Sequence, residues 1–274
     1  MAEPSVIRRV TVPQVRASKR DRGSDPIVML TAYDTPGARI CDAAGVDMIL
    51  VGDSVANNVL GYPDTLHVDV PTMAGHVAAV RRAGPRSLVI GDMPWMSYHV
   101  SKKETLRNAE MLVRAGAEAV KLEGGRERLD VIEALLNAEI PVMGHLGLTP
   151  QSVLAMGGYK VQAKEHAAAE ALLQDAKELS ATGCFAIVLE GVPDVVAARV
   201  TAEVDVPTIG IGAGSACDGQ VLVFHDLLGL NDGKAPKFVR RYAQLAEVAT
   251  EAVKAWATDV RSGTFPSDAE TYHA

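Results

Sequence analysis

Five short apolar runs of the sequence end in ionisable side chains, namely Asp53, Asp92, Glu123, His145 and Glu190. A single carboxylate at the end of a strand is usually a helix cap or a turn residue. Five such runs in one chain are harder to explain as caps, because a charged group beside buried aliphatic residues is costly unless it is paired or binds a metal. The pattern predicts a polar site at one edge of a sheet.

A lysine shares one of these runs with a carboxylate. Lys121 and Glu123 are two positions apart in the segment 119–125, so on a strand their side chains point to the same face. One interpretation is a buried structural ion pair. The other is a lysine and a carboxylate that point at one ligand.

The carboxylates among these residues favour a hard metal ion. Asp53, Asp92 and Glu123 offer only oxygen ligands, which suits Mg²⁺ or Mn²⁺ better than Zn²⁺. A 2-oxo acid would chelate such an ion through its carboxylate and keto oxygens, and the ion would stabilise an enolate. Glu190, from another run, would be the base, and His145 would hydrogen-bond with the substrate. The residues predict a metal-dependent enolate enzyme without naming its substrate.

Strands and helices that would position these groups alternate along the chain. Buried strands are expected at 27–32, 47–51, 88–90, 119–122, 141–144, 185–189, 208–211 and 221–224, which are rich in Val, Ile and Leu with little polar alternation. Helical spacing is expected at 35–44, 72–83, 102–115, 127–137, 164–181 and 193–203. This alternation predicts a parallel sheet, and eight strands predict a closed (β/α)8 barrel with its chemistry at the strand ends. An open doubly wound sheet is the alternative.

Two regions break the alternation. Segment 53–71 has little helical character, and segment 235–261 is a long helical pattern beyond the eighth strand. No linker-like stretch divides the chain. We therefore expect a single barrel domain over 1–274, with an N-terminal segment over 1–26 and a C-terminal helix and tail from about 235.

Composition excludes several classes of protein. The chain has 274 residues, of which 48% are hydrophobic, and a net charge of -7, which argues against nucleic-acid binding through a basic surface. No apolar stretch reaches the roughly 18 residues of a membrane span, so no membrane partner is expected. The three cysteines are far apart without a CxxC pair, which favours reduced, buried thiols in a cytoplasmic protein.

Seven longer segments carry a family resemblance: MLTAYD (29–34), AGVDMILVGDS (44–54), VLGYPDTL (59–66), GDMPWMSY (91–98), AVKLEGG (119–125), IPVMGHLGLTPQSV (140–153) and PTIGIGAGSACDGQVLV (207–223). In these segments the chain resembles the ketopantoate hydroxymethyltransferases, also called 3-methyl-2-oxobutanoate hydroxymethyltransferases. The match runs in order from about residue 10 to residue 266. Motifs as long as GHLGLTPQS are far more specific than any short catalytic pattern.

The resemblance implies a reaction. It implies a (β/α)8 TIM barrel of the phosphoenolpyruvate/pyruvate-type superfamily that transfers a one-carbon unit from 5,10-methylenetetrahydrofolate to 3-methyl-2-oxobutanoate. The product would be 2-dehydropantoate, a precursor of pantothenate and coenzyme A. The partners would be the small 2-oxo acid and the folate. Family members form large homo-oligomers, commonly decamers, and the C-terminal helix would fit an assembly role.

The resemblance also implies roles for single residues. In the family, the aspartates that match Asp53 and Asp92 hold one Mg²⁺ per subunit, in contact with the substrate, and the glutamate that matches Glu123 belongs to the surroundings of the metal. The serine that matches Ser54 and the lysine that matches Lys121 contact the oxo acid. The glutamate that matches Glu190 accepts the proton.

Some positions depart from the family pattern. Trp95 and Met96 stand where Phe-Gly is common, Gly191 stands where larger residues are common, and Asn57 and Asn58 lie in a loop that often carries small or apolar residues. These departures bear on the shape of the pocket rather than on the chemistry. Two other functions stay open: a metal-dependent lyase or phosphonomutase that uses no folate, and a non-catalytic binding barrel.

Overall fold

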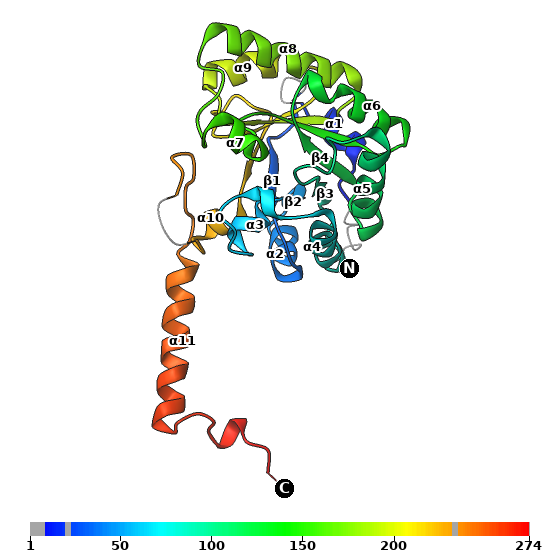
Figure 1. The fold of residues 1–274 in the computed structure, drawn as a ribbon. Helices are drawn as coiled ribbons and strands as arrows, with labels where there is room; N and C mark the ends of the chain where they lie inside the picture. Colours follow the sequence, from blue (N-terminus) through cyan, green and yellow to red (C-terminus); the bar gives the residue numbers. More distant parts are fainter. Residues whose placement is uncertain (1–8, 20–22, 232–234, 274) are drawn as a thin grey trace, which may run out of the picture. The chain divides into compact units, whose positions relative to one another are not determined.

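Eight parallel strands close into a barrel in the computed structural model, which describes residues 9–19, 23–231 and 235–273 (Figure 1). The strands follow one another around the barrel in sequence order, and β1 pairs with β8 through partners such as Ile27 with Gly219. Their bounds are β1 Ile27–Thr31, β2 Met48–Val51, β3 Leu88–Asp92, β4 Ala119–Glu123, β5 Val142–Gly147, β6 Ala186–Glu190, β7 Thr208–Ile211 and β8 Gly219–Leu222. Closure through β8 confirms the predicted (β/α)8 barrel and excludes the open sheet.

Several strand boundaries differ from the prediction. Strands β3 to β6 run one to three residues further than expected, so that Asp92, Glu123, His145 and Glu190 lie inside strands. Strand β8 begins two residues earlier than predicted, and Phe224 already belongs to a helix. The apolar pattern missed the start of β8 because it begins with glycine: a Cβ on Gly219 would lie 2.5 Å from the carbonyl oxygen of Ile27.

Helices connect the strands. The helices that pack around the barrel include α2 Thr35–Ala43, α4 Val70–Arg82, α5 Lys102–Ala115, α6 Leu129–Asn137, α8 His166–Thr182 and α9 Asp194–Glu203. Shorter ones, α3 Val55–Asn58 and α7 Val153–Met156, lie in the loops after β2 and β5. Local signals set their ends: Ser101 caps α5 by accepting from the backbone of Glu104, and Gly116 ends it in the left-handed conformation.

The N-terminal segment packs against the amino ends of the strands. Helix α1 Val12–Ala17 places Val15 in the barrel core beside Ile27 and Met29. Beyond it, the ammonium group of Lys19 forms a buried ion pair of 3.0 Å with Asp218, just before β8. This arrangement leaves the opposite end of the barrel, where the strands end, open to the βα loops.

The described residues fall into two compact units that divide between Phe224 and His225. In the second unit, α11 Leu245–Ser262 begins ten residues later than the predicted pattern from 235. The preceding segment turns back instead, and the backbone N–H of Tyr242 donates to the carbonyl of Leu227 at 2.8 Å. The single domain over 1–274 stays a prediction. No helix among the described residues has the length and hydropathy needed to span a bilayer.

Candidate active site

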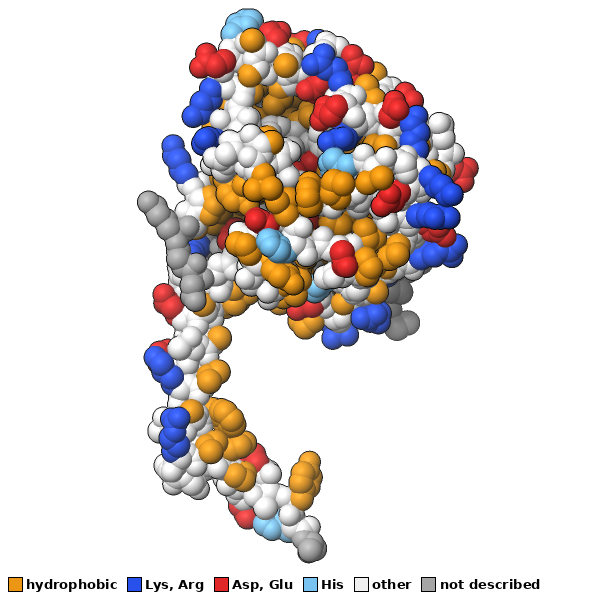
Figure 2. All heavy atoms as spheres, viewed as in Figure 1, with side chains coloured by type: hydrophobic (Ala, Val, Ile, Leu, Met, Phe, Trp, Pro, Cys, Tyr) orange, Lys and Arg blue, Asp and Glu red, His pale blue; other side chains and the backbone are white. Residues whose placement is uncertain are grey.

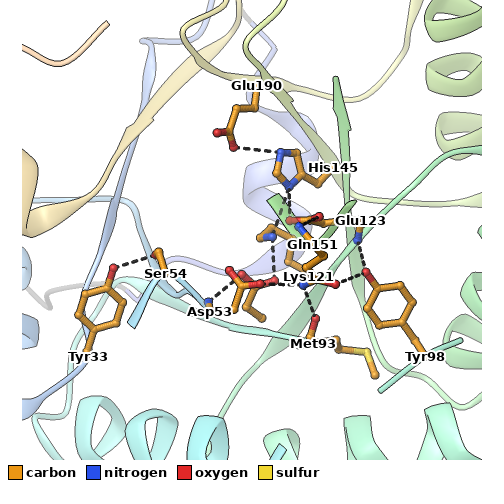
Figure 3. Close-up of polar contacts among 11 residues, drawn as sticks. Tyr33, Asp53, Ser54, Met93, Tyr98, Lys121, Glu123, His145, Gln151 and Glu190 are labelled. Carbon is orange, nitrogen blue, oxygen red and sulfur yellow. Dashed lines mark hydrogen bonds and ion pairs between the residues drawn. The ribbon is translucent and has the colours of Figure 1, made fainter. Parts of the chain in front are cut away.

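The carboxyl ends of β2 to β6 bring the predicted residues together (Figure 3). The strand register brings these side chains next to one another. Asp92 of β3 pairs with Lys121 of β4, and Glu123 of β4 pairs with His145 of β5. Glu190 is the last residue of β6. All but Glu190 are almost fully buried, so these charges interact in a setting of low polarity.

A buried ion pair forms the centre of the site. The ammonium nitrogen of Lys121 lies 2.7 Å from Oδ1 of Asp92 and 3.4 Å from Nδ1 of His145. Burial alone would lower the pKa of Lys121, but the carboxylates of Asp92, Glu123 and Asp53 raise it above its ordinary value. The lysine is therefore a fixed positive charge, able to receive an anion.

Two aspartates lie beside this lysine. The backbone N–H of Asp53 donates to Oδ2 of Asp92 at 3.1 Å. Burial, together with the charges of Asp92 and Glu123, raises the pKa of Asp53 well above its usual range. Burial also raises the pKa of Asp92, although Lys121 opposes the shift. Both carboxyl groups thus lack enough positive charge around them.

His145 links two further carboxylates. Its Nε2 lies 3.2 Å from Oε2 of Glu190, and its Nδ1 lies 3.4 Å from Oε1 of Glu123. Burial and Lys121 lower the pKa of His145, but its contacts with Glu123 and Glu190 outweigh them and raise it to about 9. Burial would raise the pKa of Glu123, but His145 and Lys121 lower it. The imidazole is therefore charged at neutral pH.

Ser54 follows Asp53 at the start of α3. Its hydroxyl shares a hydrogen bond of 2.8 Å with the hydroxyl of Tyr33, which also accepts from Thr31 at 3.1 Å. Tyr33 thus holds the hydroxyl of Ser54, the residue next in sequence to Asp53. The contact of Ser54 with the oxo acid stays a prediction.

Two residues of the site escaped the sequence analysis. The side-chain amide of Gln151 donates to Oδ2 of Asp53 at 2.8 Å, and its backbone N–H donates to Oε2 of Glu123 at 3.0 Å. The hydroxyl of Tyr98 donates to Oε1 of Gln151 at 2.6 Å. Both come from loops, where no periodic pattern marks a side chain that turns inward. Their only signal was membership of the long segments GDMPWMSY and GHLGLTPQS.

The donor set fits a divalent cation held by few protein ligands. Among the described residues, no group of three or more His, Cys, Asp or Glu side chains is arranged to hold a metal ion, and Glu123 is engaged by His145 and Gln151. Asp53 and Asp92 nevertheless adjoin each other, and four carboxylates face only two cationic side chains. An ion such as Mg²⁺ accepts one or two carboxylates and keeps its other positions for water or substrate. One such ion would neutralise the excess negative charge.

Comparison with known proteins identifies the family. The family model for ketopantoate hydroxymethyltransferase matches residues 9–268. The chain belongs to the ketopantoate hydroxymethyltransferase family. Relatives in this family include the 3-methyl-2-oxobutanoate hydroxymethyltransferase of Koribacter versatilis (strain Ellin345), which is 57% identical over 91% of this chain and 85% of that protein. The second such enzyme of Bradyrhizobium diazoefficiens is 52% identical over 97% of this chain and 90% of its own length. Membership of the ketopantoate hydroxymethyltransferases makes the chain an enzyme of the transferase class.

Solved structures of other enzymes have the same barrel fold as this chain. Phosphonopyruvate hydrolase superposes with a TM-score of 0.61 at 14% identity, covering 96% of this chain and 92% of that one. A 2,3-dimethylmalate lyase of the PEP mutase/isocitrate lyase superfamily gives a TM-score of 0.59 at 17% identity, covering 95% of this chain and 91% of the lyase. At such identities the likeness shows the fold alone, and that fold is the barrel expected from the sequence.

Proposed function

We propose that the chain transfers a hydroxymethyl group from 5,10-methylenetetrahydrofolate to 3-methyl-2-oxobutanoate, giving 2-dehydropantoate for the synthesis of pantothenate and coenzyme A. Its relatives are named for this oxo acid and this transfer. The observation that carries the proposal is the buried cluster of Lys121, Asp53 and Asp92, which lies on the same rim as the carboxylate of Glu190.

Binding of the oxo acid would use the centre of this cluster. Lys121 supplies the positive charge that receives the carboxylate of the substrate, and Ser54 supplies a hydroxyl beside it. Asp53 and Asp92 would hold one Mg²⁺ per subunit, within reach of Glu123. That ion, when bound, supplies an electrophile that polarises the keto group and stabilises negative charge on its oxygen.

Removal of the proton at C3 would be the work of Glu190. It is the least buried of the four carboxylates, with a side chain 16% exposed, and Figure 3 shows it apart from Asp53. His145, cationic between Glu190 and Glu123, would orient the base. A hydrogen bond from His145 to the substrate would require one of its ring N–H groups to leave its carboxylate. The electron pair left on C3 then forms the new bond to the methylene carbon of the folate, both of whose carbon–nitrogen bonds are broken. Water supplies the hydroxyl oxygen, and tetrahydrofolate leaves with the proton from C3 and one proton from the water.

The folate would occupy the mouth of the barrel. Loops that follow β2, β3 and β5 expose large apolar side chains, among them Leu60, Trp95, Leu154 and Tyr159. Hydrophobic side chains gather across the barrel unit on the face drawn in Figure 2, while charged ones lie mainly around its edge. A flat pterin and an aminobenzoyl ring would find apolar surface there.

We also propose that the enzyme is a cytoplasmic homo-oligomer, with ten subunits as the family resemblance implies. In the C-terminal unit, no residue of α11 is buried, and the helix exposes Val248, Val253, Trp256 and Val260. An apolar helix face of this kind requires a covering surface. Sedimentation velocity of the purified protein tests this: a single species of ten chains supports it, and a monomer at micromolar concentration refutes it.

A product assay tests the reaction. The enzyme is incubated with Mg²⁺, 3-methyl-2-oxobutanoate and 5,10-methylenetetrahydrofolate, and 2-dehydropantoate is followed by mass spectrometry. Product that requires both substrates and disappears with EDTA supports the proposal. Cleavage of an oxo acid without folate would favour the lyase or phosphonomutase alternative, and folded protein that makes no product would favour a binding barrel.

A further inference from the structure

Gln151 lies buried within the site and is hydrogen-bonded to groups from several of its elements. It lies just after β5, in the short 3-10 helix Pro150–Ser152, and is 5% exposed. Its side-chain nitrogen donates to Oδ2 of Asp53 at 2.8 Å and to the carbonyl of Met93 at 3.0 Å. Its side-chain oxygen accepts from Tyr98 at 2.6 Å. Every hydrogen-bonding group of the amide therefore has a partner.

The surroundings fix which way this amide points. Asp53 and the carbonyl of Met93 can only accept, so the nitrogen of Gln151 must face them. The hydroxyl of Tyr98 accepts a hydrogen bond from the backbone N–H of Glu123 at 3.2 Å. The hydroxyl proton of Tyr98 is therefore donated to the side-chain oxygen of Gln151. The donors thus run in one direction, from β4 through Tyr98 and Gln151 to Asp53, and bonds in such a chain strengthen one another.

This chain sets the position of one carboxylate. Gln151 donates a hydrogen bond to Oδ2 of Asp53, whereas no hydrogen bond within the described residues uses Oδ1 of Asp53. The backbone N–H of Gln151 also holds Oε2 of Glu123 at 3.0 Å. One residue therefore ties the carboxylate that follows β2 to the one that ends β4.

We propose that Gln151 is a positioning residue, which, with Tyr98 behind it, holds Asp53 by Oδ2 so that Oδ1 is presented to the divalent cation. The inference rests on the proposed function, since it assigns Asp53 to that cation. In this assignment Gln151 acts through Asp53 and is not itself a ligand of the substrate or the metal. Partners that orient metal-binding side chains commonly change metal affinity or activity by about 10- to 100-fold when they are removed.

The test measures binding of Mn²⁺, which stands in for Mg²⁺ and reports through its electron paramagnetic resonance signal. Gln151→Met removes the amide at nearly constant volume, and Gln151→Glu keeps the shape but turns an oxygen toward Asp53. Gln162→Met is the matched control, because Gln162 lies in the same connection after β5. Among the described residues, its side-chain amide donates only to the backbone carbonyl of Lys160, at 2.8 Å. Thermal melts check that each variant is folded.

We expect both Gln151 variants to bind Mn²⁺ about 10- to 100-fold more weakly, while the Gln162 variant binds like the wild type. When the Gln151 variants are saturated with metal, their kcat should return closer to the wild-type value than their KM for the oxo acid does. Should Gln151→Met not fold, Tyr98→Phe removes only the hydroxyl behind Gln151, and a several-fold loss of Mn²⁺ affinity is expected.

Folded Gln151 variants with wild-type Mn²⁺ affinity would overturn the inference and leave the proposed function intact. Loss of stability without loss of affinity would assign Gln151 a packing role and would overturn the inference in the same way. A wild-type enzyme that binds no Mn²⁺ and makes product in EDTA would overturn the proposed use of the metal, and the inference with it.

Discussion

Replacement of Lys121 by Met removes the central positive charge of the site and leaves its shape nearly unchanged. The lysine is buried, and it pairs with Asp92 at 2.7 Å while also facing Glu123 and Asp53. Without it, four carboxylates would face His145 alone. We expect Lys121→Met to abolish binding of the oxo acid and to lower the free energy of unfolding strongly.

The structure sets the size of this loss. At an effective dielectric constant near 20, two charges 2.7 Å apart attract by about 6 kcal/mol. Part of this is offset because the buried lysine no longer has to be desolvated, so that breaking a buried pair from one side costs about 3–5 kcal/mol. The loss must depend on pH. In the variant the folded-state pKa of Asp92 rises further above its unfolded value of about 3.9, so the folded form binds a proton more readily than the unfolded form. The variant therefore loses stability as the pH rises from the unfolded-state pKa of Asp92 through its higher folded-state pKa. Its loss of unfolding free energy relative to the wild type is smallest at about pH 4.

Urea denaturation at equal chain concentrations between pH 5 and 8, in EDTA, measures the effect. The matched control is Lys103→Met, which changes an exposed lysine on α5 and should stay within about 0.5 kcal/mol of the wild type. Adding Mg²⁺ should restore more stability to Lys121→Met than to the wild type, because the variant has the greater excess of negative charge. A Lys121→Met protein as stable as the wild type at pH 8, or equally destabilised at every pH, would refute this account of the site's charges.

Three further predictions concern the rest of the barrel unit. Burial raises the pKa of the Cys41 and Cys184 thiols to about 12, so neither should react with Ellman's reagent at pH 8 until the protein is unfolded in urea; rapid reaction of the native protein would contradict their burial. Lys19→Met should lower the free energy of unfolding by about 3–5 kcal/mol, measured in urea, because it leaves the carboxylate of Asp218 buried without its cation; a change below about 1 kcal/mol would contradict this. Glu139 is exposed and has a φ of 62°, so Glu139→Gly should stabilise by about 0.5–1 kcal/mol, with relief of backbone strain exceeding the added flexibility of the unfolded chain; a destabilised variant would show that no strain is stored there.

Much of the site was predictable because strands impose a simple geometry. Asp92, Lys121 and Glu123 share one edge because parallel strands end together, and Lys121 and Glu123 share a face because side chains alternate. The roles proposed for them rest on the family resemblance as well as on charge and burial. His145 was expected to contact the substrate, which stays a prediction; the structure places it between two carboxylates.

Loop residues could not be found in this way. Gln151 and Tyr98 reach the site through the particular paths of the loops after β5 and β3, and these paths have no sequence period. Met96 is a further loop residue whose backbone conformation was not predicted. The family resemblance suggested glycine at this position, and Met96 has a φ of 66°, a region that favours glycine. The start of α11 was missed because the backbone before it bonds to the segment that follows β8, a contact distant in sequence.

The central claim is that Glu190 takes the C3 proton of the oxo acid at this site. Wild type and Glu190→Gln are incubated with Mg²⁺ and 3-methyl-2-oxobutanoate in D₂O, and the C3 proton is followed by NMR. The account predicts metal-dependent exchange in the wild type and exchange about 10²- to 10⁴-fold slower in the variant, with binding of the oxo acid largely retained. Exchange at the wild-type rate in Glu190→Gln would contradict it and would remove Glu190 from the role of base.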